Sequence, residues 1–315
     1  MTWIQAIIIA IVEGLTEFLP ISSTAHIKFT RAIMGISAGN AFMDMYDIVI
    51  QFAAILAVVF LYFKKFIDVK NISFYIKLAI AVMQSLIFGF LFKKHIDKML
   101  GDVTVIACIT LAGGVLLLFI EKLLKNSKIE EEEQITPISA EFAPYIVLIN
   151  GKIEEEGQIT PLNALKIGVF QLLAILLPGF SRSAATIIGG MANGLTKKAA
   201  AEFSFFLAVP TMAAATAKDI WDTMKSSPQV LHDSSNIATL GIGCAVAFIV
   251  SVLAMKSFLS YVQKHSFAAF GIYRIIAGCA MLALIYTHVI KIPPATTTRI
   301  QTPKQHALCT NYTAK

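Results

Sequence analysis

Long uncharged stretches constrain the fold of this chain more than any other feature. They cover Ile48–Phe63, Leu78–Phe92, Val103–Ile120, Ile167–Ser181, Phe203–Ala217, Ser234–Met255 and Ile275–Ile290. A membrane-spanning helix needs about 20 mostly apolar residues, so several stretches must extend into their flanks. Only 15% of residues are charged, against about 25% in soluble domains, and the mean hydropathy is +0.72. We predict an all-α integral membrane protein, a polytopic helical bundle with about eight spans plus broken or re-entrant helices.

A polar segment, EGLTEFLPISSTAH from Glu13 to His26, interrupts the apolar N-terminal region. Ionisable groups at membrane depth are costly, so they indicate a functional site. Glu13 and Glu17 are four residues apart and share one helix face. Two such carboxylates repel each other unless a cation lies between them, and Mg²⁺ commonly binds one or two carboxylates together with substrate phosphates. The alternative is a pair of acids satisfied by neighbouring helices.

The second part of this segment has the residues of a helix start. Pro20 ends one helix, and Ser22, Ser23 and Thr24 are residue types that begin the next. A helix N-terminus binds anions, so Ser22 and Ser23 could hold a phosphate, or one could attack it. His26 lies three residues after Ser23 on the same face, and a hydroxyl beside an imidazole is a nucleophile–base arrangement. His26 could also protonate a leaving group or be structural.

A second polar segment, PGFSRSAAT from Pro178 to Thr186, repeats this pattern. Pro178 and Gly179 break the helix, and Ser181 and Ser183 can cap the next one. Arg182 can grip a phosphate with two parallel hydrogen bonds, and the Thr186 hydroxyl lies one turn further on. The alternative for Arg182 is an internal salt bridge to Glu13, Glu17 or Glu202.

The two segments divide the chain. Each has a Leu-Pro break followed by serines, and an acid follows each, Asp47 and Glu202. We predict two inverted-topology halves, 1–125 and 162–291, whose interrupted helices meet at a site near the bilayer midplane. An acidic connector, 126–161, joins them and contains a duplicated decapeptide, KIEEEEQITP and KIEEEGQITP. The polar tail, 292–315, is predicted to be disordered.

The motifs EGLTEFLPISSTAH and PGFSRSAATIIGG, followed by AEFSFFLAVP, resemble the paired motifs of bacterial undecaprenyl-pyrophosphate phosphatases of the bacitracin-resistance type. The resemblance covers about residues 3–290. It implies metal-dependent hydrolysis of undecaprenyl pyrophosphate to undecaprenyl phosphate and inorganic phosphate, which recycles the lipid carrier for cell-wall synthesis and confers bacitracin resistance. It also implies a multi-pass protein of the bacterial inner membrane with two re-entrant segments and an outward-facing site.

The resemblance and the residue chemistry together suggest roles for each position. Glu13 and Glu17 would hold Mg²⁺ or Ca²⁺, and Ser23 is preferred narrowly over Ser22 as nucleophile, with His26 as its acid–base partner. A metal-bound water, or His26 itself, stays open as the attacking group. Glu17 and Arg182 join the catalytic set. The substrate-binding candidates are Arg182, Ser181, Ser183, Thr186, Ser22 and Thr24.

Two other functions, a lipid transporter and a structural subunit, would use the polar residues differently. A lipid transporter would share the broken helices but would not need the Ser–His pair, and a structural subunit would use its polar residues only to join helices. Type-2 phosphatidic-acid phosphatases are excluded, because no arginine here precedes a proline and Ile188 stands where their histidine would follow Arg182. The expected partners are a polyprenyl pyrophosphate and the bilayer, not nucleic acid, and a homo-oligomer stays open.

Cys108, Cys244 and Cys279 lie in apolar stretches without metal-binding spacing, which predicts core packing.

Overall fold

The computed structural model describes residues 1–36, 41–68, 70–130, 153–226 and 233–290. These residues form helices, apart from their connections and one isolated parallel bridge between Ile153 and Leu195. Six of the described helices are long and apolar enough to cross a membrane, which confirms the all-α membrane fold. They are α3 (Ala41–Leu61), α5 (Ile72–Leu91), α7 (Val103–Glu130), α11 (Lys197–Ser226), α12 (Ser234–Lys264) and α13 (Ala268–Tyr286).

Two further apolar helices are shorter, which corrects the expectation of about eight full spans. Helix α1 (Trp3–Thr16) ends before Pro20, and helix α9 (Pro161–Leu176) ends before Pro178. Proline has no N–H and disfavours helical backbone in the preceding residue, so each helix stops short of a full span. After each break a short helix begins, α2 (Ser23–Ile33) and α10 (Arg182–Ala192). The remaining elements are α4 (Phe63–Ile67), α6 (Lys93–Leu100) and the 3₁₀ turn η1 (Glu156–Gln158).

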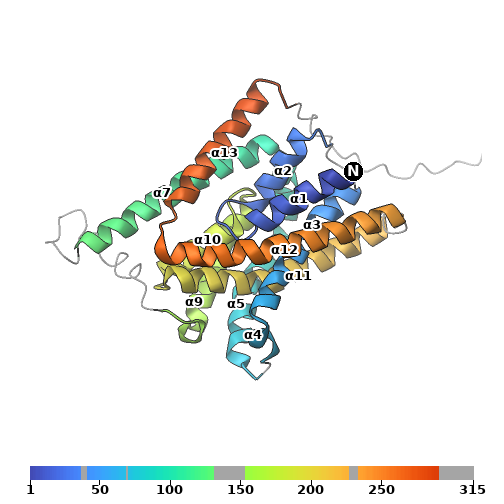
Figure 1. Ribbon diagram of the computed structural model, residues 1–315. Coiled ribbons are helices and arrows are strands. Elements are labelled where there is room, and N and C mark those ends of the chain that lie inside the picture. Colours follow the sequence, from blue (N-terminus) through green and yellow to red (C-terminus); the bar gives the residue numbers. More distant parts are fainter. Residues whose placement is uncertain (37–40, 69, 131–152, 227–232, 291–315) are drawn as a thin grey trace, which may run out of the picture.

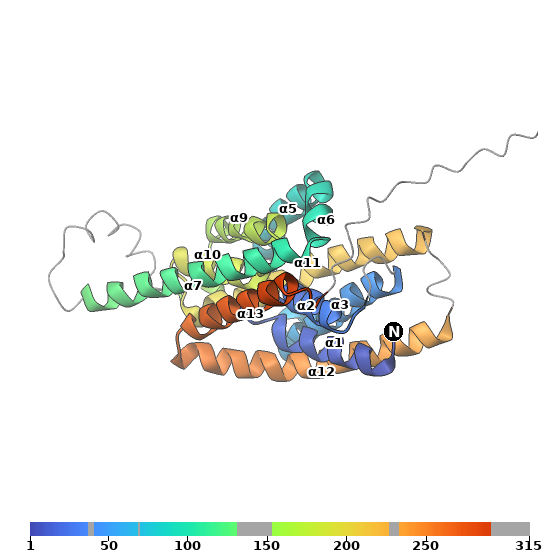
Figure 2. The same ribbon diagram turned by 90° about the horizontal axis from the view of Figure 1, so that it is seen from above.

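The main helix pairs join the first part of the chain to the second (Figures 1 and 2). Helix α1 packs on α12, α9 on α5, α7 on α13, and α3 on α11. Glycines allow the close crossings: a Cβ at Gly14 would lie 2.8 Å from the Ala247 carbonyl oxygen, and one at Gly168 would lie 2.5 Å from that of Ala81. This reciprocal pairing suits two related halves, a division that stays a prediction.

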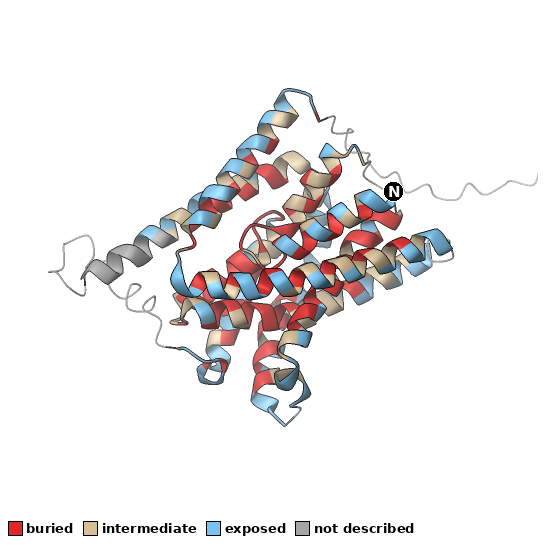
Figure 3. Ribbon diagram, in the orientation of Figure 1, coloured by how far each residue is buried: buried red, intermediate tan, exposed pale blue. Residues whose placement is uncertain are grey.

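Buried residues gather in the middle of the bundle, around the two helix breaks (Figure 3). The cysteines differ from expectation: Cys108 on α7 and Cys279 on α13 are exposed, and Cys244 is half-buried. The prediction of core packing is therefore wrong for Cys108 and Cys279. A membrane helix is apolar all round, so apolar neighbours in the sequence do not distinguish a lipid-facing position from an interior one.

The second copy of the decapeptide packs against the helices, and we call Ile153–Thr160 the strap. The Ile159 side chain is buried in the core, and Thr160 caps α9 at its N-terminus. Glu156 is also buried, and its carboxylate lies 3.7 Å from the ammonium of Lys77 on α5. The first copy is only partly described, since its residues from 131 onward lie outside the described ranges, as does the predicted disordered tail.

Candidate active site

The two helix breaks have the same local construction. Ser22 and Ser181 are the N-cap residues of α2 and α10, with φ angles of +73° and +80°. The Ser22 hydroxyl accepts a hydrogen bond from the Ala25 amide at 3.3 Å, and the Ser181 hydroxyl accepts one from the Ala184 amide at 3.2 Å. Predicted capping by Ser22 and Ser181 is thus confirmed. Both caps leave the first N–H groups of a helix at the centre of the bundle, where an anion would be favoured.

Glu17 links the two motifs. One oxygen of its carboxylate accepts a hydrogen bond from the Arg182 guanidinium at 2.5 Å, and the other accepts one from the Ser23 hydroxyl at 2.5 Å. Both Glu17 and Ser23 are buried. The first motif therefore supplies a carboxylate and a hydroxyl in direct contact, and the second supplies the cation that pairs with them. A hydroxyl bonded to a carboxylate is a nucleophile–base arrangement.

Arg182 forms the internal salt bridge to Glu17 that the sequence left as an alternative. Its second terminal nitrogen donates to the carbonyl of Ser204 on α11 at 3.2 Å. An arginine side chain has five N–H donors, so these two bonds leave three for another ligand. The Arg182 side chain is 13% exposed, so it is partly reachable, and the salt bridge is compatible with a phosphate-binding role.

His26 is engaged differently from the sequence-based expectation. Its Nδ1 lies 2.8 Å from the Ser22 carbonyl oxygen, and its Nε2 lies 2.8 Å from the hydroxyl of Tyr273 on α13. The two rings stack at 5.5 Å. Since a carbonyl only accepts, Nδ1 must carry the proton, and Nε2 of neutral His26 then accepts from Tyr273. Neither ring nitrogen of His26 bonds Ser23, whose hydroxyl donates to Glu17 instead.

The supporting hydroxyls surround the second break. Ser183 donates to the Leu19 carbonyl at 2.8 Å and so ties the second motif to the first, and it lies 3.0 Å from the Ser181 hydroxyl. Thr186 bonds the Ser204 hydroxyl at 2.7 Å. Thr24, by contrast, is half-buried and forms none of these contacts. Contacts around the two breaks thus bring together every candidate residue except Thr24 and Glu13.

Glu13 is the residue whose surroundings indicate a metal site. Its carboxylate is fully buried, and neither oxygen receives a hydrogen bond from a described residue. Glu17, Asp47 and Arg182 are the charged groups that interact with it. Buried charges are normally paired or bind metals, so a Glu13 carboxylate without a donor, one helix turn from Glu17, fits a cation. No cluster of three His, Cys, Asp or Glu ligands occurs among the described residues, so substrate phosphates or water would have to complete the coordination.

Sequence reasoning missed three contributors: Ser204, Tyr273 and Arg274. Ser204 lies in the apolar stretch Phe203–Ala217, and its spacing from other polar residues does not indicate a functional site. Arg274 is fully buried on α13, beside Tyr273. An arginine within an apolar span is itself a functional signal, and this one was available from the sequence.

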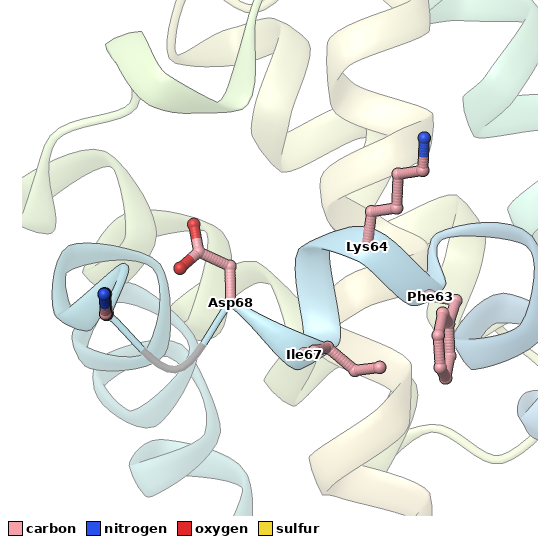
Figure 4. Close-up of a pocket in the computed structure, with 5 residues that line it drawn as sticks. Phe63, Lys64, Ile67 and Asp68 are labelled. Carbon is pink, nitrogen blue, oxygen red and sulfur yellow. The ribbon is translucent and has the colours of Figure 1, made fainter.

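A surface hollow lies elsewhere, at α4 (Figure 4). Phe63, Lys64, Ile67, Asp68 and Lys70 line it. It contains no residue of either motif, so we do not assign the chemistry to it.

Comparisons with known proteins agree with the geometry. The family model described as "Bacitracin resistance protein BacA" matches residues 6–280. A protein of Flavobacterium psychrophilum named undecaprenyl-diphosphatase is 43% identical over 284 residues, covering 90% of this chain and 96% of the relative. A protein of the same name from Flavobacterium johnsoniae is 42% identical and covers 93% of this chain and 100% of the relative. One from Bdellovibrio bacteriovorus is 40% identical, with 91% and 97% covered.

Proposed function

The chain belongs to the bacitracin resistance protein BacA family, and we propose that it is an undecaprenyl-diphosphatase that converts undecaprenyl pyrophosphate to undecaprenyl phosphate and inorganic phosphate. The observation that carries this proposal is the chain of contacts from the Ser23 hydroxyl through the Glu17 carboxylate to Arg182. These contacts support the proposal because they join a hydroxyl, a carboxylate and a guanidinium near two helix N-termini. In the proposed reaction these groups serve as nucleophile, base and phosphate-binding cation, and the polyprenyl tail lies among the apolar helices.

Ser23 is the preferred nucleophile. Its oxygen bonds to the terminal phosphorus, the bond from that phosphorus to the bridging oxygen breaks, and the seryl proton passes to Glu17. The lipid monophosphate leaves with the bridging electron pair and takes the proton from Glu17. Water then attacks the seryl phosphate and gives a proton to Glu17, the P–O bond to Ser23 breaks, and Ser23 recovers that proton. Ser22 is less suited, because its hydroxyl already accepts the capping hydrogen bond.

Other residues bind and orient the substrate. Arg182 and the amides at the starts of α2 and α10 stabilise the charge on the phosphoryl oxygens, which supplies most of the catalysis in loose phosphoryl-transfer transition states. In this proposal His26 exchanges a proton through Nε2, the nitrogen that lies 2.8 Å from the Tyr273 hydroxyl. The Thr186 hydroxyl donates to the Arg182 carbonyl, and the Ser204 carbonyl accepts from the Arg182 guanidinium, so these two residues orient Arg182.

We also propose that activity depends on Mg²⁺ or Ca²⁺ held by Glu13 and Glu17. The support is the buried Glu13 carboxylate without a hydrogen-bond donor. A divalent cation bound there would neutralise phosphate charge and polarise phosphoryl oxygens.

The biological consequences follow from the reaction. Recycling of the lipid carrier would serve cell-wall synthesis, and removal of its pyrophosphate form would confer bacitracin resistance. We propose that the chain lies in the bacterial inner membrane with its site facing outward.

Phosphate release from undecaprenyl pyrophosphate by purified protein in detergent tests the proposal. We expect release with Mg²⁺ or Ca²⁺ and none with EDTA. Ser23→Ala should lower kcat at least about 100-fold, because it removes the attacking group. Ser257→Ala is the matched control, since this exposed serine bonds only the Leu253 carbonyl of its own helix.

The outcomes separate the remaining alternatives. Release that survives Ser23→Ala would move the attack to water or His26. No release from folded wild-type protein under any metal would overturn the phosphatase proposal and favour a transporter. EDTA-insensitive release would overturn the metal proposal alone.

A further inference from the structure

Arg274 on α13 lies behind both helix breaks. It is fully buried, its guanidinium lies over the Phe180 ring, and among the described residues it donates to backbone carbonyls. One terminal nitrogen donates to Pro20 of the first break at 3.2 Å and to Phe180 of the second at 2.6 Å. The other donates to Gly179 at 3.0 Å, and Nε donates to Thr110 on α7 at 3.1 Å. One side chain thus holds loops that are far apart in the sequence.

The charge of Arg274 has no acidic partner. No carboxylate forms an ion pair with it among the residues that the structure describes. An unpaired cation buried in an apolar bundle is costly, so its retention needs a reason beyond packing. Three of the carbonyl bonds supply one: they satisfy the backbone oxygens of Pro20, Gly179 and Phe180, which the helix breaks expose at membrane depth.

Helix α7 is shaped around this guanidinium. A Cβ at Gly113 would lie 2.1 Å from a terminal nitrogen of Arg274 and 2.8 Å from its Cζ. Only glycine leaves the room that Arg274 occupies. Because the obstructed atoms are the end of a flexible side chain, a methyl group at Gly113 would displace the guanidinium rather than the helix.

We propose that Arg274 is a positioning residue for the phosphatase reaction, a clasp that sets the first break, with Glu17 and Ser23, against the second, with Arg182. This proposal rests on the proposed function. The guanidinium of Arg274 forms no hydrogen bond with the described side chains of Glu17, Ser23 or Arg182. It acts through the backbone carbonyls of Pro20, Gly179 and Phe180, each within three residues of a site residue.

Two variants test the clasp with the full-length protein in detergent. Arg274→Lys keeps the charge but cannot reach four carbonyls, and Gly113→Ala displaces the guanidinium without altering it. We expect each to lower kcat per folded protein roughly 10- to 100-fold with KM nearly unchanged, because small misplacements of reacting groups have effects of this size. Gly89→Ala is the matched control, since a Cβ at this α5 glycine meets nothing within 4 Å.

Hydrogen exchange supplies a readout independent of activity. In both variants we expect faster amide exchange in peptides covering 17–24 and 177–184, with exchange in α5 and α12 and the thermal midpoint nearly unchanged. A purely structural role would instead speed exchange throughout and lower the midpoint. Wild-type kcat in both variants, or exchange unchanged in either loop, would overturn the clasp. If wild-type protein releases no phosphate, the proposed function fails, and the exchange experiment still decides whether Arg274 holds the loops.

Discussion

At the residue scale, Glu17 is the position most sensitive to substitution, because its carboxylate bonds both Ser23 of the first motif and Arg182 of the second. Replacing it by glutamine keeps the shape but leaves Arg182 without its counter-charge. We expect Glu17→Gln to abolish measurable phosphate release and to lower the free energy of unfolding by about 3 kcal/mol, the usual cost of breaking a buried pair. Thermal melting and phosphate release measure the two effects. Thr24→Ala, a motif position without these contacts, should leave both near wild type, and equal losses in the two variants would contradict this assignment.

The Tyr273 hydroxyl covers the nitrogen of His26 through which a proton would pass. Tyr273→Phe keeps the stacked ring and removes only the hydroxyl. We expect it to lower kcat no more than about tenfold, whereas His26→Ala should lower it about 100-fold or more, the scale of general acid–base catalysis. Steady-state kinetics decide this. Equal losses in the two variants would mean that the tyrosine hydroxyl takes part in the proton transfer itself.

The N-cap residue Ser22 stabilises α2 through the hydrogen bond that its hydroxyl accepts, but its backbone has a positive φ angle that is strained for a residue with a side chain. Its φ of +73° is a conformation that costs a side-chain-bearing residue about 1 kcal/mol and costs glycine little. Ser22→Ala loses the capping bond and keeps the strain, whereas Ser22→Gly loses the bond and relieves it. We therefore expect Ser22→Gly to unfold at a higher temperature than Ser22→Ala. The reverse order would show that the fold imposes no strain at this position.

At the scale of elements, the strap ties the connector to the membrane helices through a buried ion pair. Lys77 on α5 is buried, donates to the carbonyls of Glu156 and Gly157, and pairs with the Glu156 carboxylate. Lys77→Met removes the donor to these two carbonyls, and Lys65, 3.5 Å from the Glu156 carboxylate, remains as its ion-pair partner. We expect the free energy of unfolding to fall by about 1–3 kcal/mol, the cost of leaving buried polar groups without a hydrogen bond. Phosphate release by the folded fraction should persist, because the pair belongs to neither motif. Lys64→Met, at an exposed lysine, is the control for thermal melting.

The sequence predicts the helix breaks and their caps but not the side-chain partners between helices. The proline breaks and the serine caps were predictable, because proline and N-cap serines act locally. The partner of Ser23 was not predictable, since a turn whose geometry the sequence does not specify separates Glu17 from Ser23. The spacing from Ser23 to His26 suggested a different hydrogen bond. The outward direction of Cys108 and the contact of Ser204 with Arg182 depend on which face of each long apolar helix meets its neighbours, and apolar periodicity carries no such information in a membrane span.

At the scale of the whole molecule, the predicted halves interlock rather than stand apart. Helices α1, α3, α5 and α7 each pack on a helix that follows the connector. We therefore expect chains 1–130 and 151–315 to fold only together. Co-expressed, they should co-purify and release phosphate, whereas either alone should fail to accumulate as a monodisperse protein. A half that purified and melted cooperatively by itself would contradict this.

The contact between Glu17 and Arg182 spans 165 residues of chain, and this separation sets an order of events during synthesis. Ribosomes add about 5–20 residues per second, so the acids of the first segment emerge roughly 10–30 s before the arginine that will pair with them. Arg274 emerges later still. During that interval Asp47 can already pair with Arg31 of the first half, but Glu17 lacks the arginine that binds it in the folded protein. We therefore expect the joining of the two motifs to be a late event in the assembly of this protein.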